Sequence, residues 1–181
     1  GSCIVSAALV DIARAHAPVL MVACPLVGAA LVLMLRAARL AWIAAFAAAG
    51  VGAYIAIDSA SIVLSGAPQP IAIVGIALHI DGAGVFAAAL LALTAGFVAL
   101  AIGLTLNDAG SAVTPFGLVL VLCVVAGWSA ALLLRDLVAV IVAVEMAWLA
   151  AVGLTALHAE RDRASLNGAL RMLSLGGVST V

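Results

Sequence analysis

A single acidic side chain, Glu145, lies inside a long apolar stretch of the sequence. The stretch "DLVAVIVAVEMAWLAAVGL" runs from Asp136 to Leu154. If a helix begins at Leu137, a rise of about 1.5 Å per residue places Glu145 roughly 12 Å along it. That depth is near the middle of a hydrocarbon core about 30 Å thick, where an acidic residue costs at least ~2.5 kcal/mol.

Two states of Glu145 lower this cost. The carboxyl can take up a proton, because desolvation disfavours its charged form, or it can stay ionised beside a cation or water. A carboxyl that switches between these states suits a proton relay, whereas a neutral glutamate bonded to a neighbouring helix would be structural. The residues one turn away along the helix are all apolar. They are Ile141, Val142, Trp148 and Leu149.

Arg171 is the one arginine expected within a later helix, so it is a candidate charge partner. The alternative is an arginine that extends its stem to reach the membrane interface. His79 and Asp81 would share one face of a strand, where they could bind a proton or an ion; the alternative is a solvated loop pair. The cysteines show no metal spacing, so we predict no metal site and no cofactor. They are Cys3, Cys24 and Cys123.

The composition predicts a membrane protein. Of the 181 residues, 68% are hydrophobic and 8% charged, and the mean hydropathy is +1.42. A soluble domain carries about 25% charged residues, so this chain could not cover a water-facing surface. The net charge of -1 gives no indication of nucleic-acid binding. The predicted class is an all-α integral membrane protein with the lipid bilayer as its solvent.

The apolar segments predict one transmembrane domain over residues 1–181, with a bundle of five to six helices. A membrane helix needs about 20 apolar residues, and charged residues close most of the segments. Trp128 and Trp148 fall in mid-helix, so we expect them to face the bundle or a neighbour. The expected helices cover residues 18–35, 40–57, 84–106, 115–134 and 137–157, with the start of a sixth at 165–181.

A short segment between the second and third helices differs from the rest. "IAIVGIALHI", Ile71 to Ile80, is too short to span as a helix and is rich in β-branched residues. It predicts an extended segment or hairpin near one surface. The loops that follow the first and fifth helices carry most of the arginines, which favours a cytoplasmic location for both. Arg14 and Arg135 are the exceptions to this orientation.

Four stretches together resemble the N-terminal portion of the antiporter-like subunits shared by respiratory complex I, Mrp cation/proton antiporters and membrane-bound hydrogenases. The resemblance is nearest to the D-type member of the Mrp antiporters. The stretches are "PVLMVACPLVGAALVLMLR", "IVGIALHIDGAGVFAAALLALTAG", "LLLRDLVAVIVAVEMAWLAAVGL" and "ASLNGALRMLSLGG". The resemblance implies that Glu145 is the family's functional glutamate, which pairs with a lysine during proton transfer.

This sequence departs from the family pattern at several points. Arg135 stands where the family has a glycine before Asp136, and valine and alanine replace the aromatic run before Glu145. Family members also have many more helices, and their central lysines would lie beyond residue 181. We therefore expect a fragment, a split subunit or a degenerate accessory. Because the chain has no lysine, the resemblance implies that another membrane subunit supplies the cation.

Three functions follow as hypotheses. The first is an antiporter-like subunit of a proton- or cation-translocating complex, not catalytic alone, with Glu145 as proton relay and Arg171 as a possible partner. The second is a structural accessory membrane subunit without transport activity. The third, a small independent transporter or channel, has little polar lining beyond Glu145. The expected membrane is the bacterial inner membrane, with the mitochondrial inner membrane as the alternative.

Overall fold

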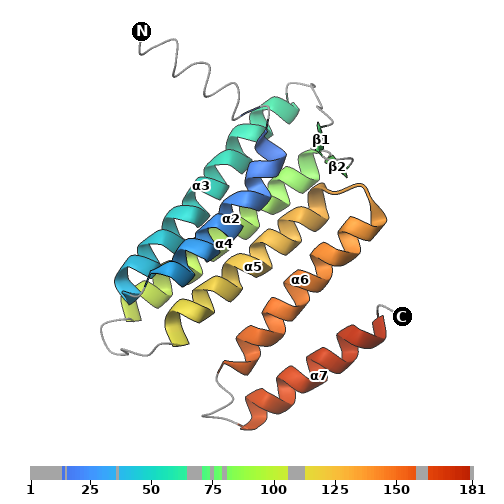
Figure 1. The fold of residues 1–181 in the computed structure, drawn as a ribbon. Helices are drawn as coiled ribbons and strands as arrows, with labels where there is room; N and C mark the ends of the chain where they lie inside the picture. The colour runs from blue at the N-terminus through green and yellow to red at the C-terminus, as the bar shows by residue number, and fades with distance from the viewer. Residues whose placement is uncertain are drawn as a thin grey trace.

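A computed structural model of the chain describes residues 14, 16–35, 37–64, 71–73, 76–78, 81–105, 113–157 and 163–179. In this part of the chain, helices pack side by side and a small hairpin lies at one end of the bundle (Figure 1). In chain order, the elements are α2 (Ala17–Met34), α3 (Ala38–Leu64), β1 (Ile71–Ile73), β2 (Ile76–Leu78), α4 (Gly82–Thr105), α5 (Val113–Leu133), α6 (Leu137–Ala156) and α7 (Arg163–Ser179).

The predicted class, an all-α membrane bundle, is confirmed. Among the described residues, five helices, α2 to α6, are long and apolar enough to cross a membrane, with mean hydropathies from 2.0 to 2.5. Such helices satisfy their own backbone hydrogen bonds, as a hydrocarbon environment requires. The observed helix ends lie within about two residues of the expected ones, except at the end of α3.

The expected end of α3 at Ile57 was wrong, because the helix continues to Leu64. The charge of Asp58 suggested an end there, but Arg14 pairs with this carboxylate. The Arg14 Nε lies 3.0 Å from the Asp58 Oδ2, and a second guanidinium nitrogen lies 3.2 Å from the Oδ1. This two-point contact neutralises Asp58 within the helix, so its charge does not stop the helix.

The extended segment after α3 is a small antiparallel hairpin. Ile71 pairs with Leu78, and Ile73 pairs with Ile76. The prediction of an extended segment between the second and third helices is therefore confirmed for β1 and β2. His79 and Ile80 lie outside the described residues.

Aspartates begin two of the membrane helices. The Asp81 carboxylate accepts a hydrogen bond from the Gly84 N–H at 2.6 Å at the start of α4. The Asp136 carboxylate accepts one from the Val138 N–H at 3.2 Å at the start of α6. Each bond satisfies a backbone donor that the first turn of a helix leaves free. Only Leu134, Arg135 and Asp136 separate α5 from α6.

The ends of the helices alternate between two ends of the bundle. The start of α2, the hairpin and the α5–α6 link lie at one end (Figure 1). The α2–α3 link, the end of α6 and the start of α7 lie at the other. Arg39 and Arg163 are thus at the same end, as the expected orientation requires, and Arg135 is at the opposite end.

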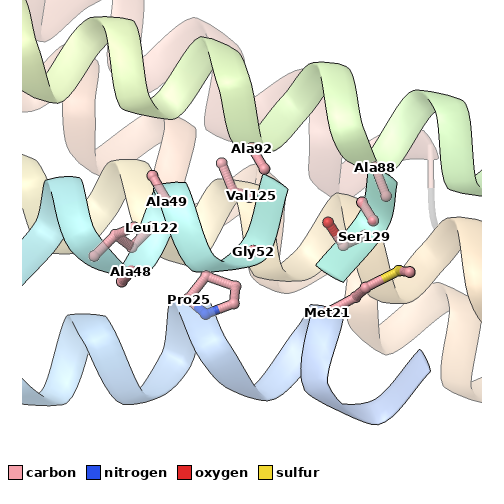
Figure 2. Close-up of a pocket in the computed structure, with 11 residues that line it drawn as sticks. Met21, Pro25, Ala48, Ala49, Gly52, Ala88, Ala92, Leu122, Val125 and Ser129 are labelled. Carbon is pink, nitrogen blue, oxygen red and sulfur yellow. The ribbon is translucent and has the colours of Figure 1, made fainter. Parts of the chain in front are cut away.

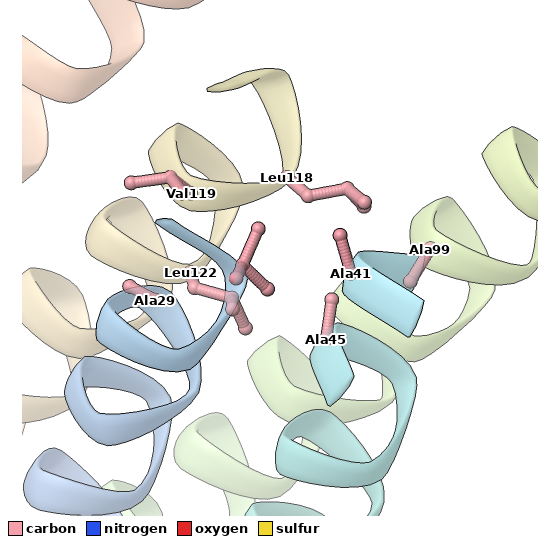
Figure 3. Packing of buried hydrophobic residues seen from close by; sticks show 8 residues of the cluster. Ala29, Ala41, Ala45, Ala99, Leu118, Val119 and Leu122 are labelled. Atoms are coloured by element: carbon pink, nitrogen blue, oxygen red, sulfur yellow. The ribbon is translucent and has the colours of Figure 1, made fainter. Parts of the chain in front are cut away.

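Small residues let the helices approach closely. Figure 3 shows one buried cluster between α2, α3, α4 and α5, in which alanines from three of the helices pack beside larger side chains of α2 and α5. Its members are Ala29, Val32, Ala41, Ala45, Ala99, Leu118, Val119 and Leu122. Lipid leaves no hydrophobic driving force between helices, so close van der Waals packing of this kind supplies the attraction.

The α5 and α6 backbones approach closely at Gly127. A Cβ atom at this position would lie 2.7 Å from the Ala143 carbonyl oxygen and 2.9 Å from the Ala147 backbone nitrogen. Backbone atoms cannot rotate away as a side chain can. Any residue larger than glycine at position 127 therefore has to push the two helices apart.

We predict that Gly127→Ala destabilises the bundle by about 1–3 kcal/mol, because overpacking outweighs the gain in helix propensity. The measurement is the free energy of unfolding in mixed detergent micelles. Gly117→Ala, in the same helix, is the control. Its Cβ would meet only the Leu157 Cδ1 at 3.4 Å, so it should be neutral or stabilising. Equal stability of the two variants would contradict the prediction.

Candidate functional site

Glu145 is the ninth residue of α6 and lies near mid-span. At about 1.5 Å per residue it is roughly 12 Å from Leu137 and roughly 16 Å from Ala156. It is therefore far from both ends of a helix that can cross a membrane. The expected depth of Glu145 follows directly from the cap at Asp136, which sets where the helix begins.

The side of α6 that carries Glu145 faces away from α5. Successive helical residues are rotated by about 100°, so Val138, Val142 and Leu149 all lie within about 60° of Glu145. These three are 68%, 63% and 55% exposed. The buried face is about 140–160° away from Glu145 and packs on α5. It consists of Ala143, Ala147 and Ala150.

Glu145 itself is half-buried on this outer face. Within the described residues its carboxylate accepts no hydrogen bond and joins no ion pair. Its helix also lies at the edge of the bundle, because 17% of the α6 span is buried compared with 56% of α5. An acidic group thus lies at mid-span of a membrane helix, on a surface that the described part of the chain covers only in part.

Helix α7 runs antiparallel to α6 and packs along it (Figure 1). The Trp148 Nε1 donates a hydrogen bond to the Met172 carbonyl oxygen at 3.2 Å. The Ser165 hydroxyl donates to the Thr155 carbonyl oxygen. Trp148 therefore faces a neighbouring helix, as predicted, whereas Trp128 is 41% exposed.

Arg171 lies on α7 at about the level of Leu149, because the Trp148–Met172 and Thr155–Ser165 contacts define the register. This level is one helical turn, roughly 6 Å, from Glu145 along α6. Arg171 is exposed, and no ion pair joins it to Glu145 in the described structure. Glu145 and Arg171 thus lie on adjacent helices but form no ion pair, so the role of Arg171 as a charge partner stays a prediction.

The remaining polar candidates have structural roles or lie outside the described residues. Asp81 caps α4. His79 lies outside the described residues, so a proton or ion site formed by His79 and Asp81 stays a prediction. The Cys24 thiol donates to the Ala48 carbonyl oxygen at 3.5 Å. Across the described ranges, no group of three or more metal-ligating side chains is close enough to hold a metal ion.

Two comparisons with known proteins identify no relative of this chain. Neither a scan against protein-family models nor a search of curated proteins finds a match to the chain. The description of the site therefore depends on the residues and their arrangement alone.

Two features of the site could not be found by sequence reasoning. The outward direction of Glu145 depends on which face of α6 packs on α5. The sequence does not identify that face, because the residues of α6 are apolar on every side of the helix. The α6–α7 contact depends on Gly176, where a Cβ would lie 2.0 Å from the Trp148 Nε1. The one sequence signal was a tryptophan in mid-helix, which favoured a contact with a neighbouring helix.

We predict that Gly176→Ala separates α7 from α6 and lowers stability by about 1–3 kcal/mol, because the indole ring fills the space that a methyl group needs. Gly168→Ala, also in α7, is the control, since its Cβ would meet nothing within 4 Å. The measurement is Trp fluorescence during unfolding in micelles. If both variants unfold alike, Gly176 is not needed for the contact.

Proposed function

We propose that the chain is an antiporter-like membrane subunit of a proton- or cation-translocating complex, in which Glu145 is a proton-relay carboxyl. One observation carries the proposal. Glu145 lies at mid-span of α6, half-buried on the face turned away from α5, with no charged or hydrogen-bonding partner among the described residues.

A carboxyl in that position has two ways to lower its free energy. Lipid contact disfavours any charged group there, because the group loses its hydration. Beside a cation or water it is ionised. A neighbouring membrane subunit that brings a basic side chain to α6 and withdraws it would drive the carboxyl between these states. Glu145 would release a proton and take one up in each cycle.

The partner in this proposal belongs to another membrane subunit. The chain contains no lysine, and Arg171 lies on α7 one turn from the level of Glu145 without contacting it. At this distance the Arg171 guanidinium would attract the ionised Glu145 carboxylate, so Arg171 is a second cation that the proposal allows for it. The membrane that we propose is the bacterial inner membrane, with the mitochondrial inner membrane as the alternative.

A structural accessory subunit is the second candidate, and the mostly apolar interior of the bundle favours it. Among the described residues, the fully buried polar side chains are Ser59 and Ser129, and the rest of the core is apolar. A continuous proton path needs more polar groups or water than this. In the accessory function Glu145 is a neutral group that hydrogen-bonds to a neighbouring subunit.

Glu145→Gln in the assembled complex distinguishes the two functions. Glutamine keeps the size and hydrogen-bonding capacity of a protonated glutamate but cannot release a proton. For a relay, we expect proton or sodium transport in proteoliposomes to fall at least about tenfold while the complex assembles normally, since a positioned proton donor contributes about 10²–10⁴-fold.

Glu145→Asp is the matched control, because it keeps a carboxyl on a shorter side chain and should retain part of the transport. Undiminished transport by the glutamine variant would reject the relay and leave the accessory function. Loss of assembly in both variants would also reject the relay, because it would show that Glu145 is needed for contact with the neighbouring subunit.

The proposed orientation has its own test. In a variant with Cys3, Cys24 and Cys123 replaced by serine, a membrane-impermeant maleimide should label Arg135→Cys in intact cells. Arg39→Cys, at the opposite end of the bundle, should react only after the membrane is opened, because arginine-rich loops face the cytoplasm. The reverse pattern of labelling would overturn the orientation.

A further inference from the structure

A small cavity lies between α2, α3, α4 and α5, and no residue of α6 lines it (Figure 2). Residues from four helices line it, and small side chains of α3 and α4 leave the space open. The lining residues are Met21, Pro25, Ala48, Ala49, Gly52, Ala56, Ala88, Ala92, Leu122, Val125 and Ser129. Its volume would hold about one water molecule.

Ser129 of α5 supplies the one side-chain oxygen in this lining. It is 2% exposed, and its hydroxyl makes no hydrogen bond within the described structure. Other serine and threonine hydroxyls in the described part of the membrane helices bond to a carbonyl of their own helix. The Ser59 hydroxyl donates to the Ile55 carbonyl oxygen at 2.7 Å, and the Thr155 hydroxyl donates to that of Val152 at 2.8 Å.

A second polar group is available at the same cavity. Pro25 lies inside α2 and has no N–H, so the carbonyl of Met21, four residues earlier, loses its usual helical donor. Met21 and Pro25 both line the cavity (Figure 2). A free carbonyl in a membrane bundle is costly, and neighbouring hydroxyls or ordered water commonly satisfy it at such helix breaks.

We propose that the cavity binds a single water molecule that joins the Ser129 hydroxyl of α5 to the Met21 carbonyl of α2. The water donates one hydrogen to the carbonyl and accepts the hydroxyl hydrogen of Ser129. It satisfies both groups and links the two helices at the break caused by Pro25. Two polar partners and space for one molecule are the conditions under which buried water is stable.

The first test is a double-mutant cycle on the unfolding equilibrium in mixed micelles. Ser129→Ala should raise the unfolding constant about fivefold, as the loss of one net hydrogen bond predicts. Pro25→Ala restores an N–H donor to the Met21 carbonyl, so in that background Ser129→Ala should change the constant less than about twofold. An equal effect of Ser129→Ala in both backgrounds would overturn the water site.

The second test distinguishes a bound water from an empty cavity and does not need the Pro25 variant to fold. Gly52→Ala adds a methyl group at the cavity, 3.8 Å from the Ala92 Cβ. Gly50→Ala, in the same helix, adds one where nothing lies within 4 Å. Both changes gain the same helix propensity, so comparing them isolates the effect on the cavity.

A methyl group that displaces bound water leaves two polar groups unsatisfied. We therefore expect the unfolding constant of Gly52→Ala to exceed that of Gly50→Ala about fivefold. In a dry cavity the added methyl group would fill empty space and stabilise the protein. A Gly52→Ala constant equal to or smaller than that of Gly50→Ala would therefore reject the bound water.

Discussion

Close contact between helix backbones is the constraint on which this structure depends. Lipid tails are as apolar as the side chains they would replace, so burial of apolar surface gives little attraction between membrane helices. The chain relies instead on glycine and alanine at the crossings, as at Gly127 against Ala143 and Ala147. These small residues leave few large side chains in the core, and they also create the cavity beside Pro25, which no large side chain fills.

The same constraint explains why Glu145 lies on the outer face of α6. The alanine face of α6 is the one that can approach α5 closely, so the opposite face carries the larger side chains and the carboxyl. Among the described helices, α7 lies beside this face, where Trp148 donates a hydrogen bond to Met172. The packing of α6 on α5 and the outward position of Glu145 are thus two results of one distribution of residues around α6.

Much of the fold could be predicted because charges and aspartate caps mark where apolar helices begin and end. Asp81 and Asp136 each open a helix, and the sequence places both before a long apolar run. The end of α3 was missed because Arg14, 44 residues away, neutralises Asp58. A contact between residues so far apart leaves no local pattern in the sequence. The depth of Glu145 was predictable from a count of residues, but its direction depended on the packing of α6 against α5.

The link of three residues between α5 and α6 has a consequence for how the protein enters the membrane. Leu134, Arg135 and Asp136 are too few for one helix to insert long before the other, so α5 and α6 would enter as a helical hairpin. The free energy of insertion is then shared between both helices. Both helices have a mean hydropathy of 2.4, so α5 helps to offset the cost of the carboxyl in α6. The hairpin then brings Glu145 to mid-membrane with the alanine face of α6 already packed on α5.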